Sequence, residues 1–350
     1  MMLRRRILLA GLAGGPAVDC AVRGARAAPA FPVAEWESFK RRFVSPDGRV
    51  IDTGNGGVSH SEGQGWGMLF AVAAQDEATF TQIAKWTSGN LARPSDALHA
   101  WRFVPGAKRQ AGDRNNATDG DIFIASALAR AGRSWGQSDR LEAAAGIARD
   151  ILRLLVRRIG PYTVLLPGLQ GFEAKDALTV NLSYYAFPLI AELAALVPSD
   201  EWEVLVRDGR TLIDRGRFGT WKLPPDWLRI ASSGALATSP GWPPRFSFDA
   251  VRVPLWNAWA GLPNRTAMVA IDRFWSGYPA DRVPAWINLE TGEVAPYPMT
   301  PGMLAIADIL RSGLGQPPLN PPPTVDSAND YYNAALILLS AMAAEEVVTR

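Results

Sequence analysis

The sequence predicts an all-α protein built as a single domain, and three observations support that prediction. Apolar residues recur at helical spacing in many separate windows, strand-like alternation is scarce, and no linker-like change in composition occurs between residues 34 and 348. Apolar residues make up 48% and charged residues 20% of the 350, the balance of a globular protein with a sizeable core. Periodicity alone leaves a helical bundle, a solenoid and an α/α barrel open.

The helical periodicity predicts about eleven or twelve helices. The clearest windows are Gly65–Ala74, Ile122–Ala131, Leu141–Val156, Leu178–Leu196, Trp202–Ile213, Met303–Leu310 and Tyr331–Ala343. Further helices are expected over 34–43, 76–90, 250–260 and 265–276. Tyr162–Leu166 is the best strand candidate, and the proline-dense Gly315–Pro323 is expected to form an extended surface loop.

The first 27 residues have the layout of a secretory signal peptide. Arg4, Arg5 and Arg6 precede an apolar stretch, and Ala25-Arg26-Ala27 supplies the small residues of a cleavage site. A short membrane-surface helix is the alternative, and both general and twin-arginine export remain open. We therefore expect residues 1–27 to be removed and residues 28–350 to form the mature domain, located in the periplasm or secreted.

Composition excludes several other classes of protein. Residues 1–27 hold five Arg and one Asp, so their removal changes the net charge from +2 to −2 and leaves no electrostatic case for nucleic-acid binding. A single Cys excludes a disulfide framework. Because the sequence has only this Cys and two His, a zinc site built from Cys and His is not expected. No apolar run is long enough to span a membrane in the mature protein. The 13 Trp indicate either a large core or flat rings offered to a ligand.

The first candidate cluster for chemistry is the glycine-rich stretch around Glu62, with sequence SHSEGQGWGM. Glycines at alternate positions leave the backbone without side chains. A substrate could therefore approach a buried carboxyl closely at this point. The alternative is an ordinary helix start, in which Ser59 or Ser61 caps the helix and Glu62 lies near its positive end.

The second cluster is the run NNATDGDIFIA, which contains Asp119 and Asp121. Thr118 or Asp119 can cap the helix that follows, but a cap needs only one carboxylate. A polar turn with two solvated acids is the alternative to a functional pair.

The third cluster is RFSFDAVRVPLW, in which Asp249 and Arg252 share a helix face. The alternative is a local salt bridge, which contributes well under about 1 kcal/mol when exposed. Here the acid lies among aromatic and branched apolar residues, and such surroundings raise the pKa of a carboxyl.

Taken together, the clusters contain the groups that cleavage of a glycosidic bond requires. One carboxylic acid protonates the leaving oxygen, while a separate carboxylate activates water from the opposite face of the sugar. Tryptophan rings can stack on the apolar faces of sugars, and Asp, Asn and Arg can bind the hydroxyls.

The three clusters also resemble the signatures of glycoside hydrolase family 8. The matching stretches are SEGQGWGM (61–68), ATDGDIFIASALARAGRSW (117–135) and FDAVRVPLW (248–256), and the late segment DYYN (330–333) is also similar. The resemblance covers about residues 34–348 and is greatest to the periplasmic endoglucanases that accompany bacterial cellulose synthase. It implies an (α/α)6 barrel with the cleft where the inner helices begin, and inverting hydrolysis of a β-1,4-glucan without a metal or organic cofactor.

The resemblance also implies a role for each candidate residue. Glu62 aligns with the general acid of the family, and Asp249 aligns with the general base. Asp119 aligns with the residue that binds the distorted sugar. For substrate binding, Trp101 matches a stacking tryptophan and Arg252 the arginine that orients the base. Tyr184 matches the tyrosine near the attacking water, with its neighbour Tyr185 as a rival.

Two positions depart from the family pattern. Phe248 stands before the base where cellulases of the family often carry tyrosine, and Trp66 replaces a common tyrosine in the first motif. Neither departure removes a catalytic carboxylate. An inverting pair of carboxyls is expected to lie about 6.5–9.5 Å apart.

Other functions remain compatible with the sequence. Relatives in the family act on xylan, chitosan or mixed-linkage glucan, and a non-catalytic glucan-binding or assembly protein would keep the aromatic cleft without needing either acid. A helical scaffold for protein partners would need no affinity for sugar. The expected partners are a β-1,4-glucan chain and a cellulose synthase complex, and the protein is expected to act as a monomer.

Overall fold

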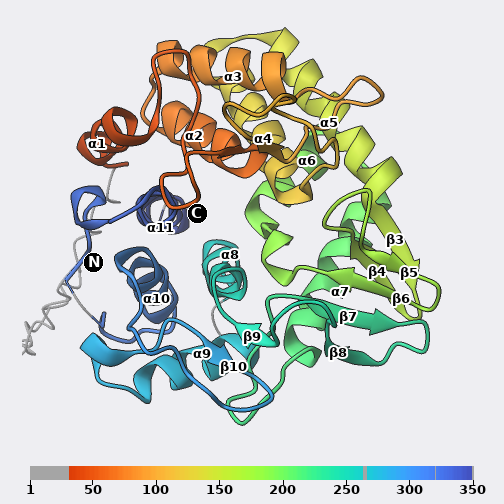
Figure 1. Cartoon of the computed structure of the whole chain (residues 1–350), viewed down its shortest axis with the longest axis vertical. Helices are drawn as coiled ribbons and strands as arrows, with labels where there is room; N and C mark the ends of the chain where they lie inside the picture. The colour runs from red at the N-terminus through yellow and green to blue at the C-terminus, as the bar shows by residue number, and fades with distance from the viewer. Residues whose placement is uncertain (1–30, 263–265, 320, 349–350) are drawn as a thin grey trace, which may run out of the picture.

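The described residues of the computed structural model, 31–262, 266–319 and 321–348, form an (α/α)6 barrel (Figure 1). Six helices form an inner ring in which each contacts the next, and the last of them contacts the first. The inner helices are α2 (Ser61–Ala73), α4 (Thr118–Trp135), α6 (Phe187–Leu196), α8 (Val253–Trp259), α10 (Pro301–Gly313) and α11 (Tyr331–Val348). The all-α fold and the barrel expected from the sequence are confirmed.

Five further helices pack outside this ring. They are α1 (Val33–Phe43), α3 (Glu77–Leu91), α5 (Ser138–Leu155), α7 (Asp200–Arg215) and α9 (Thr266–Ser276). Between α10 and α11 the described chain carries only the short 3-10 helix η4 (Val325–Ser327). The proline-dense segment expected as a surface loop lies in this connection, and its described residues are mostly exposed.

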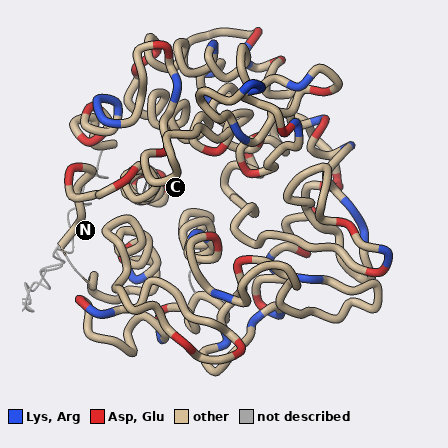
Figure 2. The backbone as a smooth tube through the Cα atoms, viewed as in Figure 1, with Lys and Arg blue, Asp and Glu red and all other residues tan. Residues whose placement is uncertain are grey.

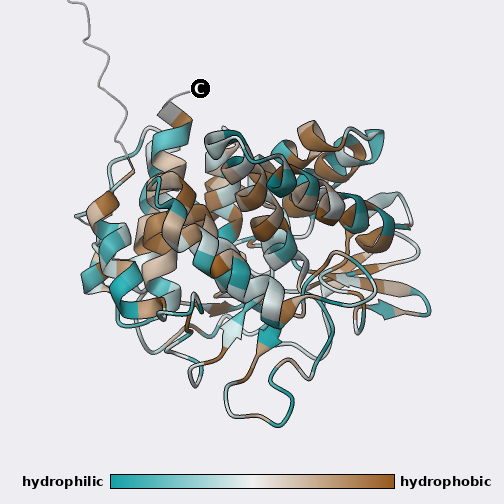
Figure 3. Cartoon of the chain, turned by 90° about the horizontal axis from the view of Figure 1, so that it is seen from above, coloured by the Kyte–Doolittle hydropathy of each residue, from teal (hydrophilic) through white to brown (hydrophobic). Residues whose placement is uncertain are grey.

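Residue patterning separates the inner helices from the outer ones. In α2, every residue from Gly63 to Val72 is buried, whereas α7 buries one stripe and exposes acidic and basic residues on its other face. Charged residues accordingly lie mostly around the outside of the ring (Figure 2). A side view shows hydrophobic residues along the helices and more hydrophilic loops at their ends (Figure 3).

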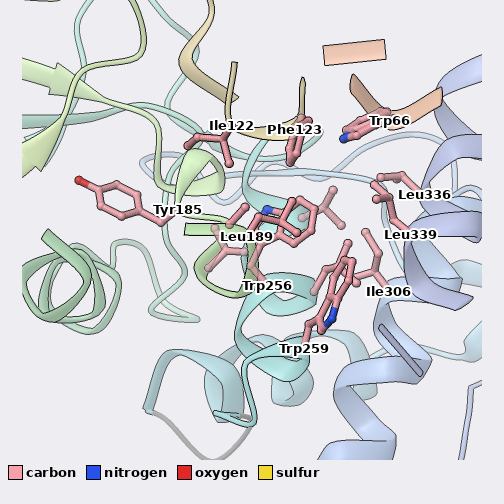
Figure 4. Close-up of a cluster of buried hydrophobic side chains, with 14 of the residues drawn as sticks. Trp66, Ile122, Phe123, Tyr185, Leu189, Trp256, Trp259, Ile306, Leu336 and Leu339 are labelled. Carbon is pink, nitrogen blue, oxygen red and sulfur yellow. The ribbon is translucent and has the colours of Figure 1, made fainter. Parts of the chain in front are cut away.

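The centre of the barrel is filled by aromatic and branched side chains from the inner helices (Figure 4). Six tryptophans are almost fully buried: Trp36, Trp66, Trp202, Trp256, Trp259 and Trp275. A large part of the tryptophan surplus therefore stabilises the core, and only the remaining ones can serve a ligand.

Short antiparallel strands lie in the connections between the helices of the barrel. A four-stranded sheet has the order β5 (Glu173–Ala174), β6 (Ala177–Val180), β7 (Leu228–Ala231) and β8 (Leu236–Thr238). The two-stranded pairs are β1 (Ser59–His60) with β2 (Arg102–Phe103), β3 (Val156–Ile159) with β4 (Tyr162–Leu165), and β9 (Arg245–Phe246) with β10 (Ile287–Asn288). The predicted strand at Tyr162 is confirmed as β4.

One helix prediction is wrong over half its length. The window Leu178–Leu196 was expected to be a single helix, but it contains β6, the short 3-10 helix η1 (Leu182–Tyr184) and only then α6. Strand β6 pairs with β7 in the register Leu178↔Ile230, a partner about fifty residues away that local periodicity cannot reveal. Pro188 lies in the first turn of α6, where its missing N–H is tolerated.

The expected signal peptide, residues 1–27, lies outside the described residues. Within the described part of the chain, no helix combines the length and the apolar character needed to cross a membrane.

Candidate active site

Glu62 and Asp119 lie in the first turns of two neighbouring inner helices. Glu62 belongs to α2 and Asp119 to α4. Glycines allow the helices to approach closely: a Cβ added at Gly120 would lie 2.7 Å from the backbone nitrogen of Glu62, and one at Gly65 would lie 3.0 Å from the backbone nitrogen of Ile124. The glycines of both motifs therefore bring the two carboxyls together.

The capping alternatives for these two helix starts are wrong. The N-cap of α2 is His60 and that of α4 is Ala117, and neither makes a side-chain capping bond. Ser59 Oγ instead donates to the Val50 carbonyl, and Thr118 Oγ1 donates to the Leu166 carbonyl at 2.6 Å. The polar residues of these motifs thus do not serve as ordinary helix caps.

Asp249 is positioned by a different kind of structure. It follows β9 and immediately precedes the 3-10 helix η2 (Ala250–Arg252), so the acid and Arg252 lie on one tight turn. The side chain of Asp249 is 30% exposed, whereas that of Arg252 is only 3% exposed. The side chain of Asp249 is therefore partly exposed, and that of Arg252 is buried.

Arg252 connects all three predicted acids. Its Nη1 pairs with Glu62 Oε2 and lies 3.6 Å from Asp119 Oδ2, while its Nη2 lies 2.8 Å from Asp249 Oδ1. Nη2 also donates to Ser183 Oγ at 3.1 Å. The local salt bridge considered as an alternative is present, but it belongs to a buried network. A planar guanidinium suits this arrangement because its donors lie in a fixed fork.

Burial and neighbouring charges raise the pKa of both aspartates. Burial raises the pKa of Asp119 well above its usual range, the nearby Glu62 carboxyl raises it further, and Arg252 opposes the shift. Burial also raises the pKa of Asp249, against the lowering effects of Arg252 and the Asn181 side chain. A carboxyl that is buried beside a second carboxyl resists ionisation, which explains the direction of the shift at Asp119.

The structure distinguishes the two candidate tyrosines. Tyr185 is fully buried, and its hydroxyl accepts a hydrogen bond from the backbone nitrogen of Leu165 at 3.0 Å. Burial raises the pKa of Tyr184 well above its usual range, and the charges of Asp119 and Asp249 add to that effect. Tyr184 therefore lies near enough to Asp119 and Asp249 for their charges to act on it, whereas the Tyr185 hydroxyl is used by the backbone.

Trp101 lies beside the start of α2. Its carbonyl accepts from the Ser61 nitrogen at 3.1 Å, and its ring stacks on His60 with centroids 5.9 Å apart and an interplanar angle of 12°. Its indole nitrogen donates to Asp113 Oδ2 at 2.7 Å. This ring is half-buried and held in a fixed orientation, as a sugar-stacking surface requires.

Asp121, the second acid of its motif, has a structural role. Its carboxylate is fully buried, with Oδ1 3.0 Å from His99 Nδ1 and Oδ2 accepting from Asn116 Nδ2 at 3.0 Å. The two acids of the motif therefore do different work: Asp119 faces Glu62, while Asp121 fixes the loop before α4.

Sequence reasoning missed two residues that contact the segment carrying Asp249. Asp226 Oδ1 accepts from the backbone nitrogens of Ser247 and Ala250, and the Tyr332 hydroxyl donates to the Phe248 carbonyl. Asp226 lies in a proline-rich stretch that resembles an ordinary connection. Tyr332 lies in the late DYYN segment, whose resemblance to the family was the one available signal.

A group of stacked rings near Tyr184 was also missed. The ring of Trp227 stacks on Phe172 at 5.7 Å and on Trp242 at 4.8 Å, and it meets Tyr184 edge to face at 6.4 Å. These three stacked rings are all half-buried, and they lie on the sheet-bearing side of the barrel.

No group of three or more His, Cys, Asp or Glu side chains in the described ranges is arranged to hold a metal ion. The three acids instead converge on Arg252. This arrangement can donate a proton from one carboxyl and accept one at another, which is the chemistry of acid–base hydrolysis.

Known proteins resemble this chain in sequence and in fold. Residues 17–346 match the sequence profile described as Glycosyl hydrolases family 8. A protein of Novacetimonas hansenii named "Probable endoglucanase" is 43% identical over 343 residues, covering 97% of this chain and 99% of that protein.

Solved structures are similar over nearly the same length. The endo-β-1,4-glucanase CMCax from Acetobacter xylinum superimposes with a TM-score of 0.87 and 45% identity, covering 91% of this chain and 100% of that one. The endoglucanase Cel10 from Klebsiella pneumoniae gives a TM-score of 0.85 and 39% identity, with the same coverage.

Proposed function

Because this chain belongs to family 8 of the glycosyl hydrolases, we propose that it is an endo-β-1,4-glucanase that hydrolyses internal bonds of a glucan with inversion. The observation that carries the proposal is the convergence of Glu62, Asp119 and Asp249 on the buried Arg252. Full-length similarity to endoglucanases supports the choice of substrate.

Glu62 is the general acid of this mechanism. Its carboxyl, protonated before reaction, gives its proton to the glycosidic oxygen as the bond breaks. The position of Glu62 supports this role, because its carboxyl lies in the first turn of α2 and pairs with the buried Arg252. Asp119 also binds the hydroxyls of the sugar at the cleavage point.

Asp249 is the general base. It takes a proton from the water that attacks the anomeric carbon on the face opposite Glu62. Arg252 holds the carboxylate in place at 2.8 Å, and Tyr184 donates a hydrogen bond to the water or the sugar beside it. No metal or organic cofactor takes part in these steps.

Aromatic rings bind the rest of the glucan chain. Trp101 offers a ring beside the acid, and the stacked rings around Trp227 offer a second surface beside Tyr184. Sugar rings lie flat on such surfaces, so the cleft accommodates several residues of the polymer.

The proposal extends to processing and cellular role. Residues 1–27 direct export and are removed, and residues 28–350 form a single catalytic domain in the periplasm or outside the cell. The protein acts on a β-1,4-glucan as it is made by a cellulose synthase complex. The support for this role is the resemblance of the whole chain to the endoglucanases that accompany such synthases.

The test is release of reducing ends from carboxymethyl cellulose by residues 28–350, followed together with the viscosity of the solution. An endoglucanase lowers viscosity steeply while few reducing ends appear, and Glu62→Gln should abolish both signals. Xylan and chitosan serve as parallel substrates. Cleavage of either of them without cleavage of the cellulose derivative would reassign the substrate, and binding to all three with no cleavage would indicate a glucan-binding protein.

A further inference from the structure

The segment that carries Asp249 has no helix to position it, because β9 ends at Phe246 and η2 begins only at Ala250. Its backbone is instead held by a buried carboxylate from outside the segment. Asp226 Oδ1 accepts from the Ser247 nitrogen at 3.0 Å and from the Ala250 nitrogen at 2.8 Å.

These two bonds lie on either side of Asp249. Asp226 is only 8% exposed, and its own backbone nitrogen donates to the Arg245 carbonyl at 2.7 Å. One side chain therefore satisfies two backbone donors that flank the base, and its own backbone is tied to the strand that leads into the segment. Buried donors of this kind are costly to leave unpaired.

We propose that Asp226 is a positioning residue for the general base, which fixes the backbone on both sides of Asp249 so that its carboxylate meets the attacking water. This inference rests on the proposed function, because it assigns a role within that reaction. Asp226 itself does not touch the substrate.

Contacts from two other elements complete the positioning. Tyr332 of α11 donates its hydroxyl to the Phe248 carbonyl, and Arg252 Nη2 holds Asp249 Oδ1. The segment is thus held by Tyr332 of α11, by Arg252 of η2 and by Asp226 in the turn before β7. Of these contacts, only those of Asp226 restrain the backbone on both sides of the base.

Asp226 needs only its acceptor oxygen, and not its charge, to make these two bonds. Burial raises the pKa of Asp226 to about 7, and the neighbouring Asp249 charge adds to that effect. A protonated Asp226 still offers Oδ1 as an acceptor, so the two backbone bonds do not require a second charge beside the base.

The experiment compares Asp226→Ala with Asp226→Asn in the full mature protein, using reducing-end release from carboxymethyl cellulose. Asp226→Ala should lower kcat about 10- to 100-fold while KM stays within about twofold, because a displaced base slows chemistry without weakening binding. Asp226→Asn keeps the Oδ1 acceptor and should recover most of the lost turnover.

Asp208 provides a matched control. It is a buried aspartate on α7, and its Oδ2 accepts from the Thr163 nitrogen of β4 at 2.8 Å, so it holds a different backbone segment from the one that carries Asp249. Asp208→Ala should lower thermal stability but leave kcat unchanged. If Asp226→Ala does not fold, Asp226→Ser takes its place, because a serine is too short to reach both nitrogens.

Each outcome has a defined meaning. Wild-type turnover in Asp226→Ala overturns the inference, as does an equal loss of kcat in Asp226→Ala and Asp208→Ala. A rise in KM with unchanged kcat also overturns it, since that would make Asp226 a binding residue. If the wild-type protein cleaves no glucan while remaining folded, the proposed function fails rather than the role of Asp226.

Discussion

The two carboxylates of the proposed reaction are held by different kinds of structure. Glu62 is fixed by the first turn of α2 against α4, which we call the acid side. Asp249 is fixed by the segment from Asp226 to Arg252, which we call the base side. This segment is held by short strands, turns and side-chain hydrogen bonds. The acid side is built by regular helix packing, and the base side by individual polar contacts. Single substitutions should therefore disturb the base side more selectively.

The largest effect is expected from Arg252→Met, because Arg252 contacts both sides. Removing the guanidinium leaves three acids without their cation, which should abolish turnover and cost about 3–5 kcal/mol of unfolding free energy. Urea unfolding and reducing-end release measure the two effects.

Arg311→Met is the matched control for this variant. Arg311 is also buried, and its Nη1 pairs with Asp272 at 2.7 Å away from the acids. It should lose stability while keeping turnover. An active Arg252→Met protein with unchanged stability would show that the two sides do not depend on this cation.

The adjacent tyrosines offer the next test. Tyr184→Phe should lower kcat about 10- to 100-fold, the effect of losing one hydrogen bond to a charged or reacting group, with little change in stability. Tyr185→Phe should cost about 1–3 kcal/mol of stability, because the Leu165 nitrogen loses its buried acceptor, and leave kcat unchanged. The reverse pattern, measured by kinetics and thermal unfolding, would exchange their roles.

The pH dependence of stability should differ between Asp76 and Asp226. At Asp76, the cap of α3 past the C-terminal end of α2, burial is outweighed by bonds from Lys40 and Thr79, which lower its pKa to about 2. Its folded pKa lies below the unfolded value, so its stabilisation is present above about pH 4 and is lost as pH falls towards 2. Asp76→Asn should therefore cost about 1–2 kcal/mol at pH 7, and the cost should vanish near pH 2.

Asp226 should show the opposite sign. Its pKa is raised to about 7, above the unfolded value, so ionising it opposes folding. Relative to wild type, Asp226→Asn should gain stability as pH rises from about 4 to 7. Unfolding free energies at pH 3, 5 and 7 measure both variants, and parallel curves for the two would refute the assigned pKa directions.

The smallest effect is expected from Trp101→Ala. Loss of one stacking ring should raise KM for a soluble cello-oligosaccharide by about 3- to 10-fold, since an aromatic contact contributes roughly 1 kcal/mol beyond its buried area. The chemical step should be unaffected. A loss confined to kcat would place Trp101 in the catalytic step instead.

Much of the acid side could be predicted from the sequence. The spacing of apolar residues located α2 and α4, and the glycine-rich and acidic motifs at their starts placed Glu62 and Asp119 at helix beginnings. These signals are local, because a helix is specified by residues three and four positions apart.

The base side could be predicted only in part. Asp249 and Arg252 were found through their spacing of three and through resemblance, but Asp226 gave no signal because its partners lie about twenty residues away. The same limit produced the error at Leu178–Leu196, where strand β6 depends on a distant partner. Long-range backbone pairing leaves little trace in local periodicity.

The most direct test of the account separates the acid from the base by the leaving group of the substrate. Dinitrophenolate leaves without a proton, whereas a sugar alcohol needs one. On carboxymethyl cellulose, both Glu62→Gln and Asp249→Asn should lose about 100- to 10,000-fold in turnover. On 2,4-dinitrophenyl β-cellobioside, Glu62→Gln should recover to within about tenfold of wild type, and Asp249→Asn should remain inactive. Equal loss in Glu62→Gln on both substrates, or an active Asp249→Asn on the activated one, would contradict the assignment of Glu62 as acid and Asp249 as base.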